Sequence, residues 1–219
     1  MLREVFSTEL HTILLMVCLL LVAITKLMFP KRFQDFIYML FNFRYLKIYG
    51  REQKFLDLFE GLLFTNLVIG LSIFSLNIYK HSSDFSNSTI KMFIFKLAIA
   101  IALFILIKVL IERIISSILS LDFIINNYIF EKISYKNFLG ILLIPINAIM
   151  LFSFTPNKTT LLIAASILIA IHSIGLFFFF KNNLNLIKKH IFYFILYLCA
   201  LEISPYVILY KSFTKIQGN

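Results

Sequence analysis

The sequence has few of the residues on which most enzyme and metal sites depend. Its 219 residues include six glycines, two cysteines and four histidines, and tryptophan is absent. With so few glycines the chain has little backbone for cradling phosphate groups, and it contains no P-loop. It also lacks C-x-x-C-H, H-E-x-x-H and G-x-S-x-G, which mark c-type haem attachment, zinc proteases and serine hydrolases. We therefore predict no metal and no cofactor, and no motif supports enzyme chemistry.

The scarce cysteines and histidines exclude two further classes of protein. Cys18 and Cys199 both fall inside apolar runs, so no disulfide framework or metal-ligand spacing is visible, and helix packing is their predicted role. Among the histidines only His172 lies deep in an apolar run. A haem held by two histidines is therefore not expected.

Charged residues are also scarce, whereas apolar residues are abundant. Only 15% of the residues are charged, 60% are hydrophobic, and the mean hydropathy is +0.91. Soluble domains are about 45–50% apolar and about 25% charged, so the excess predicts side chains that face lipid. A helix needs about 20 apolar residues to cross a bilayer. Six runs approach or exceed this length: 10–29, 58–79, 92–111, 138–154, 159–180 and 191–210. We predict an all-α, polytopic transmembrane bundle of six helices that forms a single membrane domain over 1–219.

The basic residues predict how this bundle is oriented. The net charge is +10, and Lys and Arg flank the apolar runs, which is typical of membrane proteins rather than of nucleic-acid-binding proteins. Fourteen of the 21 Lys and Arg fall on one side of the six-span arrangement and seven on the other. The positive-inside rule then makes 30–57, 112–137 and 181–190 cytoplasmic and places both termini outside. If the first or the fourth run does not cross, the N-terminus moves inside. We predict a bacterial inner-membrane protein that binds no nucleic acid.

A basic amphipathic segment follows Pro30. Apolar residues recur in it at helical spacing, namely Phe33, Phe36, Ile37, Leu40, Phe41, Tyr45 and Ile48. This stripe predicts a helix over 31–49 that lies in the membrane interface, and the basic residues of 31–54 are expected to meet anionic headgroups. A cytoplasmic connector that merely touches the bilayer is the alternative.

The last apolar run contains a carboxylate, Glu202, which is costly at membrane depth and is expected to face the bundle interior. At 1.5 Å per residue, Glu202 lies about 12 Å and His172 about 20 Å from the outer ends of their spans. Antiparallel helices tilt the two side chains toward each other, so they are predicted to meet directly or through one water molecule. Such a pair relays protons in some proteins. A polar lock between helices, or a protonated Glu202 bonded to a backbone carbonyl, explains it equally well.

Two prolines extend this candidate site. Pro205 leaves the carbonyl of Leu201 without its helical partner, and broken helices of this kind line binding sites in transporters. Pro145 and Asn147 form a similar element at a comparable depth, so a shared pocket of Asn147, Pro145, Pro205, Glu202 and His172 is predicted. Glu60 and Lys108 lie at similar depth near the cytoplasmic ends of their spans. They are predicted either to form an ion pair or to extend separately to the interface.

The stretches YKNFLGILLIPINAIMLFS and FYFILYLCALEISPYVILYK resemble a family of small integral membrane proteins of unknown function from the Bacteroidota. The sharpest element is L-Y-L-C-x-L-E-I-x-P, which here includes Glu202 and Pro205. The resemblance implies an inner-membrane protein and supplies no activity, ligand or catalytic residue.

We expect a non-enzymatic membrane component, a subunit or scaffold of an envelope assembly with protein partners in the membrane. Two other classes remain open, namely a small proton- or solute-coupled transporter that uses Glu202 and a membrane enzyme that acts on a lipid-linked substrate. A transporter is expected to show an inverted repeat and a cavity that reaches Glu202. A scaffold is expected to show a solid bundle.

Overall fold

The computed structural model describes residues 9–40, 44–50, 57–82, 87–118, 122–152 and 158–189, and within these ranges every element is helical. The elements are α1 (Glu9–Met28), α2 (Pro30–Ile37), the 3₁₀ turn η1 (Tyr38–Leu40), α3 (Arg44–Tyr49), α4 (Leu58–Ser82), α5 (Asn87–Ile118), α6 (Asp122–Phe152) and α7 (Lys158–Lys189). The prediction of an all-α fold is confirmed. Cys199, Glu202, Pro205 and the run 191–210 lie outside the described residues.

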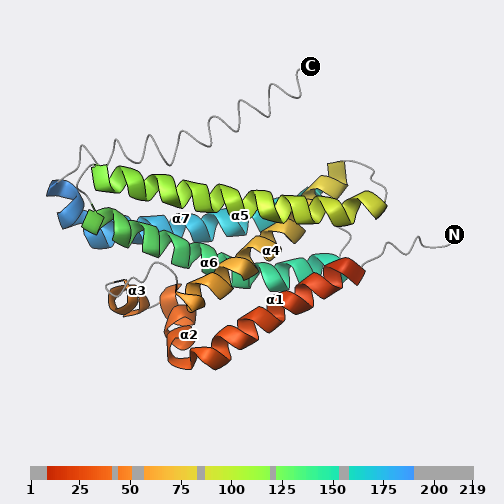
Figure 1. The fold of residues 1–219 in the computed structure, drawn as a ribbon, viewed down its shortest axis with the longest axis horizontal. Coiled ribbons are helices and arrows are strands. Elements are labelled where there is room, and N and C mark those ends of the chain that lie inside the picture. Colours follow the sequence, from red (N-terminus) through yellow and green to blue (C-terminus); the bar gives the residue numbers. More distant parts are fainter. Residues whose placement is uncertain are drawn as a thin grey trace, which may run out of the picture.

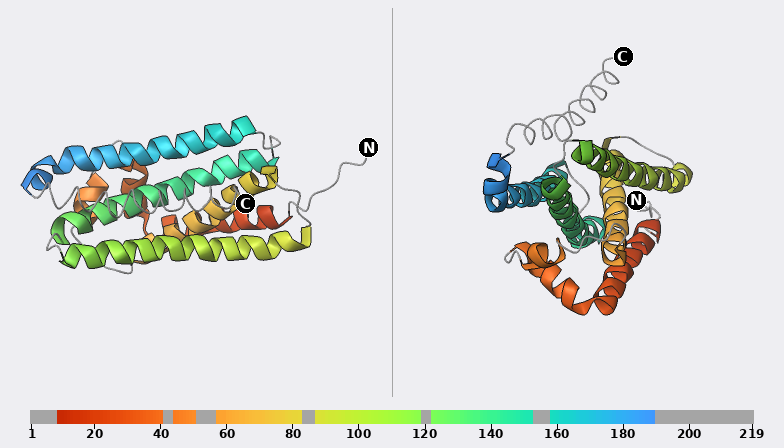
Figure 2. Two further views of the ribbon diagram at one scale, coloured as in Figure 1. Left: turned by 90° about the horizontal axis from the view of Figure 1, so that it is seen from above. Right: turned by 60° about the vertical axis from the view of Figure 1, so that its left-hand side comes forward.

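The long helices form a bundle in which α4 is central (Figures 1 and 2). Its most extensive contacts are with α6, and it also packs against α1 and α5, while α7 packs on α6. The short helices α2 and α3 lie at the end of the bundle where α4 begins (Figure 1). We call this the capped end. The position of α4 between three neighbours explains why 56% of its apolar stretch is buried, against 17% for α5.

Two glycines bring α4 and α6 close together. A Cβ atom at Gly140 would lie 2.8 Å from Cα of Leu67, and one at Gly70 would lie 3.2 Å from Cβ of Leu143. Glycine permits this approach because it has no side chain to separate the two backbones. Asn147 adds a polar contact at the same seam, since its Nδ2 donates to the carbonyl of Gly70 at 2.9 Å. These contacts fix α4 and α6 as the core pair of the bundle.

The segment after α1 is not the single helix predicted for 31–49. α1 ends before Pro30, which lacks the N–H that would continue the helix and instead occupies the first position of α2. α2, η1 and α3 then fold over the capped end. Phe36 and Tyr45 of the predicted stripe are fully buried within the chain, whereas Ile37 and Ile48 are exposed. Part of the stripe therefore packs on the bundle itself.

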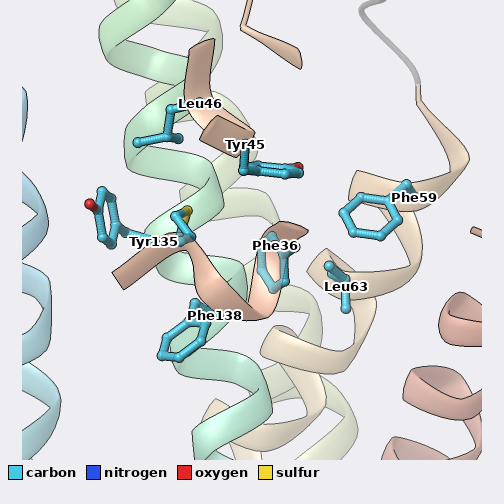
Figure 3. Packing of buried hydrophobic residues seen from close by; sticks show 8 residues of the cluster. Phe36, Tyr45, Leu46, Phe59, Leu63, Tyr135 and Phe138 are labelled. Carbon is cyan, nitrogen blue, oxygen red and sulfur yellow. The ribbon is translucent and has the colours of Figure 1, made fainter. Parts of the chain in front are cut away.

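An aromatic cluster holds this segment in place (Figure 3). Phe36 contacts Phe59 of α4 and Phe138 of α6, with ring centroids 5.6 and 6.1 Å apart. Tyr45 stacks on Phe130 at 5.9 Å and meets Phe36 edge-on at 5.3 Å. Offset and edge-to-face pairs of this kind add to the apolar area that they bury. The cluster explains how a basic segment with short helices is fixed to α4 and α6.

Among the described residues, four helices are long and apolar enough to cross a membrane by length and composition: Glu9–Met28, Leu58–Ile78, Met92–Ile118 and Ile125–Phe152. The first two match the predicted runs closely. The fourth differs, because α6 begins at Asp122 rather than near 138. Its polar residues are used inside the bundle, as Lys132 and Asn137 are buried and bonded to other helices. The predicted fifth run, 159–180, lies on α7, where a shorter apolar stretch covers Thr159–Gly175.

Candidate functional site at the capped end

Five polar side chains meet where α4 begins, and we call them the cap cluster: Arg32, Tyr45, Asp57, Glu60 and Asn137. Asp57 is the residue before α4, and its carboxylate accepts a hydrogen bond from the backbone N–H of Phe59 at 3.3 Å. An acidic residue before a helix is favoured because it satisfies a free N–H and complements the positive end of the helix dipole. The local pattern D-L-F-E thus places Asp57 and Glu60 one turn apart at the start of α4.

Arg32 of α2 is the cation of the cap cluster. Its Nη1 donates to Oδ2 of Asp57, and its Nη2 lies 3.6 Å from Oε1 of Glu60. The guanidinium also lies over the rings of Phe59 and Tyr49, 4.5 and 4.8 Å from their centroids. Because guanidinium groups are weakly hydrated and planar, arginine suits such a partly desolvated, aromatic setting. Arg32 therefore ties α2 to the first turn of α4.

Glu60 is the acceptor at the centre of the cluster. Tyr45 of α3 donates its hydroxyl to Oε1 at 2.7 Å, and Asn137 of α6 donates its Nδ2 to Oε2 at 2.7 Å. Both carboxylate oxygens thus have partners from other elements, and Arg32 balances part of the charge. A buried carboxylate is tolerated when it is hydrogen-bonded and paired in this way. Glu60 therefore joins α2, α3, α4 and α6.

Tyr45 stays protonated in this setting. Burial raises the pKa of Tyr45 well above its usual value of 10.0, and the negative charge of Glu60 raises it further. The neutral hydroxyl is the form that can donate to Glu60. The cap cluster therefore holds a stable donor against a carboxylate, and its groups are directed at one another.

A second charge pair, which is buried, links the C-terminal part of α5 to the N-terminal part of α6. Lys132 Nζ lies 2.6 Å from Oε1 of Glu112, and both side chains are almost fully buried. The ammonium also lies 5.3 Å from the ring centroid of Tyr128. Within the described ranges no group of three His, Cys, Asp or Glu side chains is arranged to hold a metal. The arrangement supports structural pairing of charges between helices.

The predicted site around Glu202 is only partly visible. Asn147 is fully buried at the α4–α6 seam, whereas Pro145, two residues earlier on α6, is exposed. His172 lies on α7, but the structure does not describe its side chain. Glu202 and Pro205 lie outside the described residues. The shared pocket of these residues therefore stays a prediction.

The predicted pairing of Glu60 with Lys108 also stays a prediction. Glu60 bonds to Tyr45 and Asn137 and lies near Arg32, as described above. Lys108 is buried on α5 and has an interaction of its own. The sequence placed the two residues at similar depth and left open whether they pair or extend separately to the interface.

Sequence reasoning missed a set of interacting residues that are buried or partly buried, namely Arg32, Tyr45, Asp57, Asn137, Glu112 and Lys132. One local signal was present, since Asp57 and Glu60 stand three residues apart directly before an apolar run, as in a helix-capping pattern. The other partners are far away in sequence: Asn137 is 77 residues from Glu60, and Lys132 is 20 residues from Glu112. Single-sequence patterns do not report such distant contacts.

In the part of the chain that the structure describes, fold and site together define a class, namely an all-helical bundle with four membrane-length apolar helices and charges paired between helices. The model of a family described as a domain of unknown function, DUF4271, matches residues 11–213. Because the match covers most of the chain, the protein belongs to this family. Membership in a family of unknown function agrees with the resemblance noted in the sequence. Neither curated proteins nor solved structures gave a match.

Proposed function

We propose that this protein is a multi-pass protein of the bacterial inner membrane, in the Bacteroidota as the sequence resemblance implies. α1, α4, α5, α6 and α7 supply five spans, and the run 191–210 supplies the sixth. The capped end then faces the cytoplasm, where the predicted surplus of Lys and Arg lies. Large apolar side chains that are exposed along α1 and α5, such as Leu20, Leu103 and Ile107, support lipid contact.

The lengths of α5, α6 and α7 are compatible with spans that extend beyond the membrane at the capped end. They contain 32, 31 and 32 residues, and at 1.5 Å per residue they are about 46–48 Å long. A hydrocarbon core of about 30 Å takes about 20 residues, which reach from Met92 to near Ile111 and from Phe152 back to near Ile133. Glu112 and Lys132 then lie at the cytoplasmic boundary. The helices extend beyond it and support α2 and α3.

Within the membrane we propose a non-enzymatic subunit or scaffold of an envelope assembly. The observation that supports this proposal is that the charged groups of the cap cluster bond to partners within the protein. Glu60 is bonded to Tyr45 and to Asn137, and Arg32 is paired with Asp57. Catalytic groups are usually directed at a substrate position and lie within reach of it. A cluster whose charged groups are paired with one another instead makes the capped end rigid, as a docking platform requires.

Site-specific photo-crosslinking in cells tests the scaffold proposal. A photoreactive residue at Ile48, which is exposed on α3 at the capped end, is expected to capture one protein. The same probe at Leu46, which is buried on α3, is the matched control and is expected to capture none. Adducts with lipid alone at Ile48 and at two further exposed positions, Ile37 and Tyr38, would argue against a protein partner at the capped end.

The six-span arrangement has a separate test. Reporter fusions within 80–91 and within 181–190 are expected to lie in opposite compartments, with 181–190 cytoplasmic. The same compartment for both would refute the arrangement without bearing on whether the protein has a partner.

A proton- or solute-coupled transporter is the second candidate, and buried amides at the α4–α6 seam favour it. Asn66, Asn137 and Asn147 are all fully buried, and such side chains often line polar paths in membranes. Glu202→Gln is expected to leave folding intact and to abolish transport under this reading, because an amide does not titrate. Unchanged pH-dependent uptake in Glu202→Gln vesicles would eliminate it.

A further inference from the structure

Three buried polar residues lie at the junction of α1, α4 and α6, and we call them the junction layer: Thr25, Asn66 and Asn137. Packing contacts bracket their positions. On one side Cys18, Ile73 and Ile144 form a common core cluster. Thr25, Asn66 and Asn137 each lie seven residues from one of these, toward the capped end, and residues seven apart share a helix face.

Contacts on the other side of the layer support the same register. Phe29, one turn beyond Thr25, meets Phe59 of α4 at 5.9 Å between ring centroids. Asn137 bonds to Glu60, the residue after Phe59. The junction layer therefore lies between an apolar layer and the aromatic end of the bundle, and each of the three helices contributes one polar side chain.

The three side chains are fully buried, and they leave three polar atoms without protein partners. These are Nδ2 and Oδ1 of Asn66 and Oδ1 of Asn137. The hydroxyl of Thr25 donates a hydrogen bond to the carbonyl of Leu21 at 2.7 Å, so the hydroxyl oxygen can still accept a hydrogen bond. A buried amide with neither group bonded is rare in proteins, because each lost hydrogen bond to water is uncompensated.

We propose that the junction layer is a binding site for water, holding one or two molecules between α1, α4 and α6. The three unpartnered atoms comprise one donor and two acceptors. A water molecule can accept from Nδ2 of Asn66 and donate to the oxygens of Asn66 and Asn137. A monovalent cation could be coordinated by the two oxygens, but it would be repelled by the partial positive charge of the Asn66 N–H₂ group. The chemistry of the set therefore selects water over a metal ion.

The site gives α1 a specific place in the bundle. In a membrane, apolar surfaces gain little by choosing one another over lipid, so polar contacts carry much of the selectivity between helices. The junction layer lets α1 recognise α4 and α6 through water. It also connects to the cap cluster, because Asn137 donates to Glu60 through Nδ2 while Oδ1 of the same side chain has no protein partner.

Water-edited solid-state NMR of the full chain in lipid bilayers, with ¹⁵N-labelled asparagine side chains, tests the proposal. Nδ2 of Asn147 is the comparison, because that group is equally buried but already donates to the carbonyl of Gly70, so that only Oδ1 of this amide lacks a protein partner. We expect magnetisation from water to reach Nδ2 of Asn66 several-fold faster than Nδ2 of Asn147. Loss of one resonance in Asn66→Leu, or in Asn66→Ser if that variant fails to fold, assigns the signal.

Two outcomes would overturn the site. Equally slow transfer to Asn66 and Asn147 would mean that the layer is dry and that its amides bond to each other. A sodium- or potassium-dependent shift of the Asn66 and Asn137 carboxamide signals, without fast transfer from water, would mean that the layer binds a cation instead.

Discussion

Removing one partner of the Glu112–Lys132 pair should weaken the bundle far more than removing both. Lys132 Nζ lies 2.6 Å from Glu112, and the two side chains are 2% and 0% exposed. Lys132→Met keeps the length and packing of the side chain but leaves the Glu112 carboxylate buried without its cation. Glu112→Leu instead removes the carboxylate that lies beside the buried Lys132 ammonium. The double variant replaces the pair by two apolar side chains of similar size.

The size of the effect follows from the burial of both groups. Breaking a buried pair by removing one partner costs about 3–5 kcal/mol, because the other charge stays desolvated. Since both side chains are almost fully buried, solvent screening reduces this figure little. The double variant should be near neutral or more stable than the natural chain, because it removes the desolvation cost of both charges.

Thermal unfolding of the purified protein in mild detergent measures the difference. For a chain of 150–250 residues, 1 kcal/mol shifts Tm by about 2–4 °C, so each single variant should lose roughly 6–20 °C. Lys96→Met is the control, because it removes an exposed lysine from α5, the helix that carries Glu112. It should change the free energy of unfolding by less than about 0.5 kcal/mol.

Two results would refute the reasoning. Single variants that match the Lys96→Met control would mean that the pair is solvated in the folded protein. A double variant whose loss equals the sum of the two single losses would mean that the side chains contribute independently, without the coupling that a buried contact requires.

Three further predictions concern the α4–α6 seam and the cap cluster. Gly140→Val should destabilise the protein by about 1–3 kcal/mol, because its Cβ would lie 2.8 Å from Cα of Leu67 and force the helices apart; in the same unfolding assay, Gly61→Ala, which meets no atom within 4 Å, should be neutral or stabilising. Tyr45→Phe should cost about 1.5–3 kcal/mol in denaturant unfolding, because it removes a hydrogen bond to the Glu60 carboxylate, and a loss no larger than that of Tyr38→Phe, at an exposed position, would contradict this role. Alkaline pH should destabilise the protein through the same residue, because the pKa of Tyr45 is raised in the folded state. The contribution of Tyr45 to stability is complete below the unfolded pKa of 10.0 and is lost as pH rises through the folded pKa. The Tm difference between the natural chain and Tyr45→Phe should therefore shrink only above pH 10.0, and a constant difference would argue against this role of Tyr45.

The sequence predicted the helical class and the long apolar helices well, because these depend on composition and local periodicity. The run predicted over 10–29 is the helix Glu9–Met28, and the run over 58–79 lies within Leu58–Ser82. The predicted start of the fourth run was wrong, because the run was expected to begin at 138 and α6 begins at Asp122. Lys132 and Asn137 precede the predicted start, yet both are buried on α6. Their burial depends on partners in other helices, which a local pattern does not contain.

The segment 31–49 also shows that a local pattern does not identify contacts with other helices, in this case for apolar residues. Its helical stripe predicted an amphipathic surface, and the presence of that surface is confirmed by the burial of Phe36 and Tyr45. The stripe does not say whether an apolar face meets lipid or protein. That choice was decided by Phe59 of α4 and Phe138 of α6, whose rings contact Phe36. Amphipathicity thus indicated an apolar contact and predicted the membrane interface as the partner, whereas Phe36 and Tyr45 pack on the protein itself.

The central position of α4 explains why polar partners gather along it. A helix in contact with α1, α5 and α6 has much of its surface buried, so its polar groups meet other helices. Glu60 accepts a hydrogen bond from Asn137, and the carbonyl of Gly70 accepts one from Asn147. Both donors come from α6, which is also the helix that Gly140 brings closest. Close backbone approach and polar bonding therefore select the same pair of helices, and α1, α5 and α7 pack around that pair.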